Sequence, residues 1–300
     1  MKENLHVSFH EQISRNKRNS IFLILLIFLV LVGLSYVIGL IYTDYFFFIL
    51  IAGIIISLSY ILIGYYNSDK IALASLGARQ ADANQYRQLY NAIEGLCLAS
   101  GMPMPRVYVM ENEQINAFAT GRNPGNSVIC VTTGALRKLN KQELEGVLGH
   151  ELSHIANYDI RFMTLTAVLV GLIAIISEIF LRSMWYRSSN DNNNKAKAGL
   201  MIIGIVLAIL APIFVQLVQL AISRKREFAA DASSVKFTRY PRGLISALRK
   251  IKSEHIGEKE ARKINKAVAP LFISNPFKNL SNLTSTHPSI DKRIEILERM

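Results

Sequence analysis

A five-residue run near the middle of the chain combines two histidines and a glutamate at a spacing that suits metal chemistry. The run reads His150-Glu151-Leu152-Ser153-His154, and apolar residues at helical spacing precede it. Residues four positions apart share one face of an α-helix, so both imidazoles can reach a single zinc ion. A glutamate beside the first histidine can take a proton from a metal-bound water. The pattern predicts a catalytic zinc with His150 and His154 as ligands and Glu151 as acid and base.

A third ligand is needed, because the five residues alone are also compatible with an ordinary helix surface that carries two histidines. Glu227 lies in the run SRKREFAAD, and Asp231 follows it by four residues. In a helix these two carboxylates share a face. Glu227 would complete a set of three protein ligands that leaves the fourth zinc position for water. Asp231 is placed to hydrogen-bond the far nitrogen of a ligand histidine. The alternative is that Glu227 only balances its three basic neighbours.

Four long apolar runs interrupt the polar sequence. Two uncharged runs of 22 residues, 21–42 and 45–66, are separated by only two residues. A membrane-spanning helix needs about 20 apolar residues, so these runs predict a tight transmembrane hairpin. Two further runs, at about 162–181 and 199–223, predict a second hairpin. Glu178 shortens the clean part of the third run, for which a buried core helix is the alternative.

The positions of Lys and Arg predict the orientation in the membrane. Three basic residues at 15–18 precede the first run, and the turn of the first hairpin has none. Three more, at 224–226, follow the fourth run. Basic residues between the third and fourth runs disagree, but the first hairpin carries the stronger signal. We expect segment 1–20 and the polar pieces 67–161 and 224–300 to be cytoplasmic parts of a multi-pass protein in a bacterial-type inner, or plasma, membrane.

The predicted zinc ligands lie close to the apolar runs but outside them. His154 is eight residues before the third run, and Glu227 is four residues after the fourth. At about 1.5 Å per helical residue, these separations are roughly 12 Å and 6 Å. A hairpin returns the chain to the side of the histidines, whereas a single crossing would separate the ligands. The zinc is therefore expected close above the bilayer surface rather than within it.

The two polar pieces together predict one domain of the α+β class. Apolar residues at helical spacing predict its helices, and short stretches between turn residues predict a small sheet. The predicted helices are 84–100, a helix from about 141 onward, 242–252 and 289–300, and the predicted strands are 106–110, 115–120 and 127–132. We expect a mainly helical integral membrane protein, with four transmembrane helices and this domain on the cytoplasmic side.

Composition supports a membrane protein and excludes several other classes. The chain of 300 residues is 51% hydrophobic and only 19% charged, which rules out a largely disordered protein. The net charge of +12 suits anionic lipid headgroups. A nucleic-acid partner is not expected, because no basic stripe is interleaved with aromatic residues. The two cysteines, Cys97 and Cys130, are expected to be core residues rather than a disulfide framework.

The order of these features resembles the HtpX-type membrane zinc metalloproteases, which are related to the membrane CAAX prenyl endopeptidases. The resemblance covers nearly the whole chain. The matching stretches are the first apolar hairpin, INAFATG, VLGHELSHIANYD, the second apolar pair, SRKREFAADASS and STHPSIDKRI.

The resemblance implies a gluzincin-like catalytic domain that binds one Zn²⁺ per chain. By family analogy His150, His154 and Glu227 hold the zinc, Glu151 is the catalytic base and acid, and Asp231 orients a ligand histidine. It also implies that the substrates are damaged or misfolded proteins, above all membrane proteins, cleaved under heat or envelope stress.

Two weaker expectations concern substrate contacts. His287 precedes a proline, as in the family pattern, and a donor there could stabilise the oxyanion of the tetrahedral intermediate. The alternative for His287 is an ordinary loop residue before the last helix. Asn116, Ala117, Phe118 and Ala119 either form a strand edge that pairs with an extended peptide substrate or belong to an ordinary core strand.

Three alternative functions remain at this point. An intramembrane protease of the site-2 type would carry the histidine motif inside a membrane helix, but polar residues flank it here. A prenyl-protein endopeptidase is disfavoured by the short chain and the four apolar runs. A zinc sensor or transporter without hydrolysis would place its ligands at mid-membrane, where this chain has none. Replacing Glu151 by Gln separates a zinc binder from a hydrolase.

Overall fold

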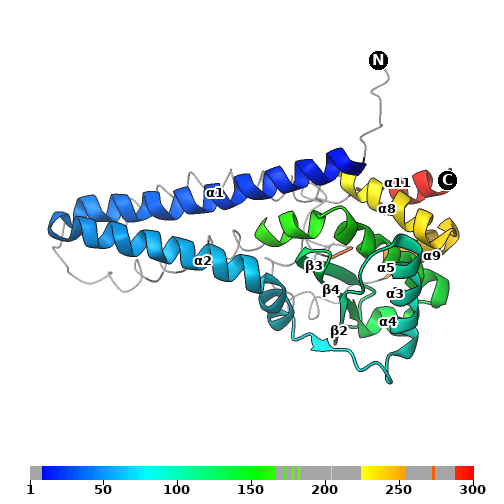
Figure 1. The fold of residues 1–300 in the computed structure, drawn as a ribbon. Helices are drawn as coiled ribbons and strands as arrows, with labels where there is room; N and C mark the ends of the chain where they lie inside the picture. The colour runs from blue at the N-terminus through cyan, green and yellow to red at the C-terminus, as the bar shows by residue number, and fades with distance from the viewer. Residues whose placement is uncertain are drawn as a thin grey trace, which may run out of the picture.

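The computed structural model describes residues 9–166, 224–254 and 288–300, the single positions 172, 178, 182 and 204, and the pair 272–273. A long helical hairpin extends from a mixed α and β body, and the C-terminal helices lie beside the start of the hairpin (Figure 1). The helices are α1 (Phe9–Ile41), α2 (Phe46–Ser75), α3 (Arg87–Ser100), α4 (Thr133–Lys138), α5 (Lys141–Ala156), α8 (Arg224–Thr238), α9 (Pro241–Ser253) and α11 (Ile290–Leu297).

Helices α1 and α2 form the predicted first hairpin, joined by a 3₁₀ turn at Thr43–Tyr45. Each is long and apolar enough to cross a membrane, over Ile13–Leu40 and Thr43–Ser75 respectively. Large apolar side chains such as Phe22, Leu29 and Phe47 are exposed along both helices, as suits contact with lipid. Small residues allow the two backbones to approach closely: a Cβ at Gly53 would lie 2.0 Å from the Ser35 hydroxyl.

Both hairpin helices are longer than the apolar runs that predicted them. The apolar runs mark only the part that meets lipid, whereas the polar ends continue as helix onto the α and β body. At the end of α2, Asp69 pairs with Arg106 at the start of β2. Ala72 and Leu73 on the same helix pack in a cluster that includes Phe118 of β3. The hairpin is thereby attached to the sheet at its polar end.

The sheet has four strands in the order β1-β2-β4-β3. Strands β2 and β4 are parallel, while β1 pairs with β2 and β3 pairs with β4 in antiparallel fashion. The bounds are β1 Arg79–Gln80, β2 Arg106–Met110, β3 Ala117–Asn123 and β4 Asn126–Thr132. Three strands agree with the sequence prediction within a few residues, whereas β1 was missed because two residues show no alternation. Strand β3 lies at one edge.

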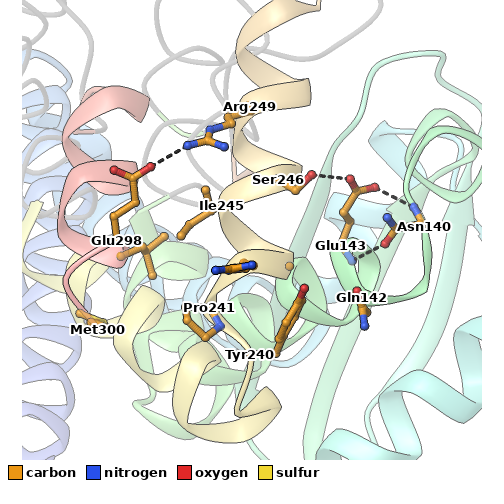
Figure 2. Close-up of a pocket in the computed structure, with 13 residues that line it drawn as sticks. Asn140, Gln142, Glu143, Tyr240, Pro241, Ile245, Ser246, Arg249, Glu298 and Met300 are labelled. Atoms are coloured by element: carbon orange, nitrogen blue, oxygen red, sulfur yellow. Dashed lines mark hydrogen bonds and ion pairs between the residues drawn. The ribbon is translucent and has the colours of Figure 1, made fainter.

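Helix α5 occupies the centre of the domain. Its first residues form a capping box, in which Asn140 and Glu143 each bond the other's backbone N–H. Glu143 also accepts a bond from Ser246 of α9 at 2.7 Å (Figure 2). It accepts another from Lys250 of the same helix at 2.7 Å. At Gly146 a Cβ would lie 2.6 Å from the Leu244 nitrogen, so only glycine permits this approach of α9. The N-terminal half of the motif helix is thus held against α9.

Most of the predicted second hairpin lies outside the described residues. Of 162–181 and 199–223, the structure describes a helical stretch over 162–166 and the three single positions 172, 178 and 204. Phe162 and Leu165 in that stretch are buried against Leu23 and Ile27 of α1. His287 also lies outside the described residues.

Candidate metal centre

Three side chains from two helices converge on one point in the interior. His150 and His154 come from successive turns of α5, and Glu227 comes from the first turn of α8. Their donor atoms all lie within 4.8 Å of one another, and all three residues are buried. The two Nε2 atoms are 3.2 Å apart. The Glu227 oxygens lie 3.5 Å from Nε2 of His150 and 3.6 Å from Nε2 of His154.

These separations fit a single zinc ion. Two ligand nitrogens at about 2.0–2.1 Å from a tetrahedral zinc lie roughly 3.4 Å apart, and a carboxylate oxygen lies at a similar distance from each. The donor set has the composition of a catalytic zinc site, with two histidines, one glutamate and no fourth protein ligand among the described residues. The residues present therefore fit the predicted metal.

Glu151 lies beside this donor set and is only 1% exposed. Its Oε1 atom is buried without a hydrogen-bond partner in the described part of the chain. Burial raises the pKa of Glu151 to about 7, although the two histidines and a bond from the Ala119 backbone oppose this shift. A carboxyl group with a pKa near neutrality can both accept and return a proton.

The far nitrogen of His150 faces a carboxylate from α8. His150 Nδ1 lies 2.9 Å from Oδ1 of Asp231. Arg293 of α11 donates two bonds to the same carboxylate, at 2.9 Å to Oδ2 and 2.6 Å to Oδ1. Although burial opposes its charged form, Arg293 and His150 lower the pKa of Asp231. Burial and Arg293 lower the pKa of His150, but the bonds to Asp231 and Glu227 outweigh them and raise it to about 9.

The far nitrogen of His154 faces a different carboxylate, which the sequence analysis did not single out. His154 Nδ1 lies 3.0 Å from Oδ2 of Asp159. Asn16 of α1 donates to the other oxygen of Asp159 at 2.6 Å, and Arg226 of α8 lies 3.8 Å from that same oxygen. An acidic residue one helical turn beyond the second ligand histidine was the available signal. It was read only as part of a polar flank.

The four residues predicted at a strand edge are all buried beside this centre. Asn116 directly precedes β3, and Ala117, Phe118 and Ala119 open that strand. The Ala119 backbone donates to Glu151, so the strand edge faces the proposed catalytic carboxylate. Part of the edge is already paired, because the Ile273 nitrogen donates to the Ala117 oxygen at 3.1 Å.

A separate cavity of about 550 Å³ lies near the starts of α5 and α9 and the C-terminus (Figure 2). Its lining includes Glu143, Tyr240 and Glu298 but none of the predicted site residues. The cavity is therefore distinct from the metal centre.

Comparison with known proteins identifies the family. The model of Peptidase family M48 matches residues 83–300. A protein named Protease HtpX homolog from Thermoanaerobacter pseudethanolicus is 46% identical over 242 residues, covering 79% of this chain and 80% of that protein. Proteins of the same name from Dictyoglomus turgidum and Streptococcus gordonii are 42% and 41% identical, covering 98% and 97% of this chain and 95% and 99% of their own lengths.

A solved structure supports the fold. The crystal structure of S. mikatae Ste24p aligns with a TM-score of 0.51 at 19% identity, covering 89% of this chain. This chain spans 62% of the length of that protein. The family match and the relatives confirm the expected metalloendopeptidase and the resemblance to HtpX proteases. The chain belongs to peptidase family M48.

Proposed function

We propose that this protein is a zinc endopeptidase of the membrane that hydrolyses damaged or misfolded proteins, above all membrane proteins, during stress. The observation that carries the zinc chemistry is the convergence of three buried donor atoms within 4.8 Å of one another, with Glu151 beside them. His150, His154 and Glu227 would hold the zinc. Bound there, the metal would lower the pKa of a water molecule and polarise the scissile carbonyl.

Glu151 is the proposed proton carrier. Its carboxylate accepts the proton of the attacking water and later returns it to the leaving amine. A pKa of about 7 supports both halves of this cycle. Asp231 and Asp159 would hold the two ligand histidines in the tautomer that leaves each Nε2 available.

The proposed substrates reach the site as extended peptides beside β3. The position of Ala119 next to Glu151 supports this route, since a substrate paired with the strand would lie beside the carboxylate. Backbone pairing reads little side-chain information, which suits substrates that are misfolded rather than defined by one sequence. Cleavage confined to a single short motif would contradict this route.

The proposed topology is a multi-pass protein with its N-terminus and catalytic domain in the cytoplasm. The basic residues at 15–18 support this orientation. The second hairpin, 162–181 and 199–223, stays a prediction. His287 stays a prediction as a stabiliser of the oxyanion.

The test compares the purified full-length protein in detergent with Glu151→Gln. We expect about one bound zinc per chain in both, and chelator-sensitive cleavage of an unfolded test protein only in the wild type. The matched control is Glu145→Gln, because Glu145 lies on the same helix and pairs with Lys141 at 3.9 Å. Zinc without cleavage in the wild type would favour a zinc sensor or transporter. Absence of zinc from both would contradict the metal site.

A further inference from the structure

Asn16, near the start of α1, forms hydrogen bonds with the turn that follows α5 and carries Asp159. Its side-chain nitrogen donates to the Asn157 backbone oxygen at 2.9 Å and to Oδ1 of Asp159 at 2.6 Å. Both acceptors are oxygens, so the orientation of the amide follows from chemistry. Asn16 is 4% exposed and Asp159 is fully buried, so water does not compete for these bonds. A polar group buried in this way is retained only with partners.

Asp159 in turn contacts His154, a proposed zinc ligand. Asp159 uses one oxygen for Asn16 and the other for Nδ1 of His154, at 3.0 Å. The orientation of the Asp159 carboxylate is therefore set from both sides. A carboxylate fixed by a donor holds the histidine ring and its tautomer more firmly than one that rotates.

Other residues already attach α1 to the domain by packing. Leu23 and Ile27 are buried against Phe162 and Leu165. The Lys17 ammonium lies 4.5 Å above the Tyr158 ring. Asn16 differs from these residues because its two donors point at the turn that carries Asp159. It also lies outside residues 83–300, the part of the chain that matches the family model.

On the basis of the zinc site proposed above, we propose that Asn16 is a positioning residue for His154. It fixes the Asp159 carboxylate, which in turn orients the imidazole toward the metal. The first membrane helix thus supplies part of the metal centre, and the catalytic domain alone lacks this donor.

The test is a double-mutant cycle in the full-length protein in detergent, with Asn16→Leu, Asp159→Ala and the double variant. Leucine is close to asparagine in size but donates no hydrogen bond. Zinc affinity is measured by competition with a coloured chelator, and thermal unfolding is measured without metal. Cleavage is then measured at low and at excess free zinc. The packing control is Leu23→Ala, on the same face of α1.

We expect Asn16→Leu to weaken zinc binding about tenfold, near the lower end of the effect of losing a partner of a ligand histidine. Excess zinc should restore its cleavage. In the Asp159→Ala background the same substitution should cost nothing further, because the intermediary is gone. Leu23→Ala should lower the unfolding temperature and leave zinc affinity unchanged.

Two results would overturn the role of Asn16 while leaving the protease intact. One is wild-type zinc affinity in Asn16→Leu. The other is an equal loss of zinc affinity in both backgrounds, which would mean that Asn16 does not act through Asp159. A wild-type protein that binds no zinc would instead overturn the proposed metal site, and this role with it.

Discussion

The two histidines proposed to bind zinc are supported from opposite ends of the chain and by different chemistry. His150 is backed by Asp231, which Arg293 of α11 holds with two charged bonds. His154 is backed by Asp159, which the neutral amide of Asn16 holds with one bond, while the Arg226 guanidinium lies farther away, at 3.8 Å. Charged, two-point bonds are stronger and more directional than a neutral single bond.

The two supports of the proposed metal site should therefore contribute differently to folding and to metal binding. The His150 support consists of residues within the family-matched catalytic part, at 150, 231 and 293. The His154 support includes Asn16 of the long apolar helix α1, so its geometry depends on how α1 lies against the domain. We expect damage to the first support to affect folding and metal binding together. Damage to the second should affect metal binding more than folding.

The largest effect is expected from Asp231→Asn. The substitution leaves the fully buried Arg293 without its main counter-charge, which costs about 3–5 kcal/mol of unfolding free energy. Zinc affinity should also fall about 10–100-fold, because the bond to His150 is weakened. Denaturant unfolding of the metal-free protein and chelator competition measure the two effects. An unfolding free energy equal to that of the wild type would contradict the proposed difference between the supports.

A smaller effect on folding is expected from Asp159→Ala. Asn16 loses one neutral bond, and the buried Arg226 loses a counter-charge 3.8 Å away but keeps Glu227, so the cost is about 1–3 kcal/mol. Zinc affinity should still fall about 10–100-fold. The same two measurements apply. If this variant loses more stability than Asp231→Asn, the ranking of the supports is wrong.

The smallest expected effect is a shift in the pH dependence of zinc affinity. In the metal-free protein the pKa of His150 is about 9, so this ring is protonated at neutral pH and must lose its proton to bind zinc. Zinc affinity should rise about tenfold per pH unit from this proton up to pH 9, and flatten above it.

The supports should differ in this profile as well. Asp231→Asn removes a bond that raises the pKa of His150. The zinc affinity of this variant should therefore stop rising at a lower pH than that of the wild type. In Asp159→Ala the zinc affinity should still stop rising near pH 9. The raised pKa also means that the metal-free fold gains stability from this pair below about pH 6.5 and loses it as the pH passes 9. A profile independent of pH between 6 and 9 would contradict both statements.

Local spacing predicted those parts of the centre that one helix can bring together. His150 and His154 share one face of α5, and Glu227 and Asp231 share one face of α8, because residues four apart always do so in a helix. The meeting of the two helices was expected from the topology of the hairpins, and their close approach occurs at Gly149, where a Cβ would lie 2.8 Å from the Ser234 hydroxyl of α8.

The residues that bond the two supporting carboxylates were not predictable in the same way. Asn16 and Asp159 are 143 residues apart, and no periodicity in either segment refers to the other. Arg293 is buried against Asp231 of another helix, and nothing in the sequence around Arg293 indicates that partner. The apolar pattern also failed to predict the true ends of α1 and α2, since polar residues there are buried by the domain rather than by lipid.

The 143-residue separation between Asn16 and Asp159 has a consequence for biosynthesis. At about 5–20 residues per second, ribosomal synthesis of the intervening chain takes roughly 7–30 s. Throughout that interval the N-terminal helix is made and the motif helix is not. Arg293, which holds Asp231, is made later still. The partners of both histidines are therefore complete only after Arg293 has been synthesised, so α1 is made well before the centre to which Asn16 contributes can form.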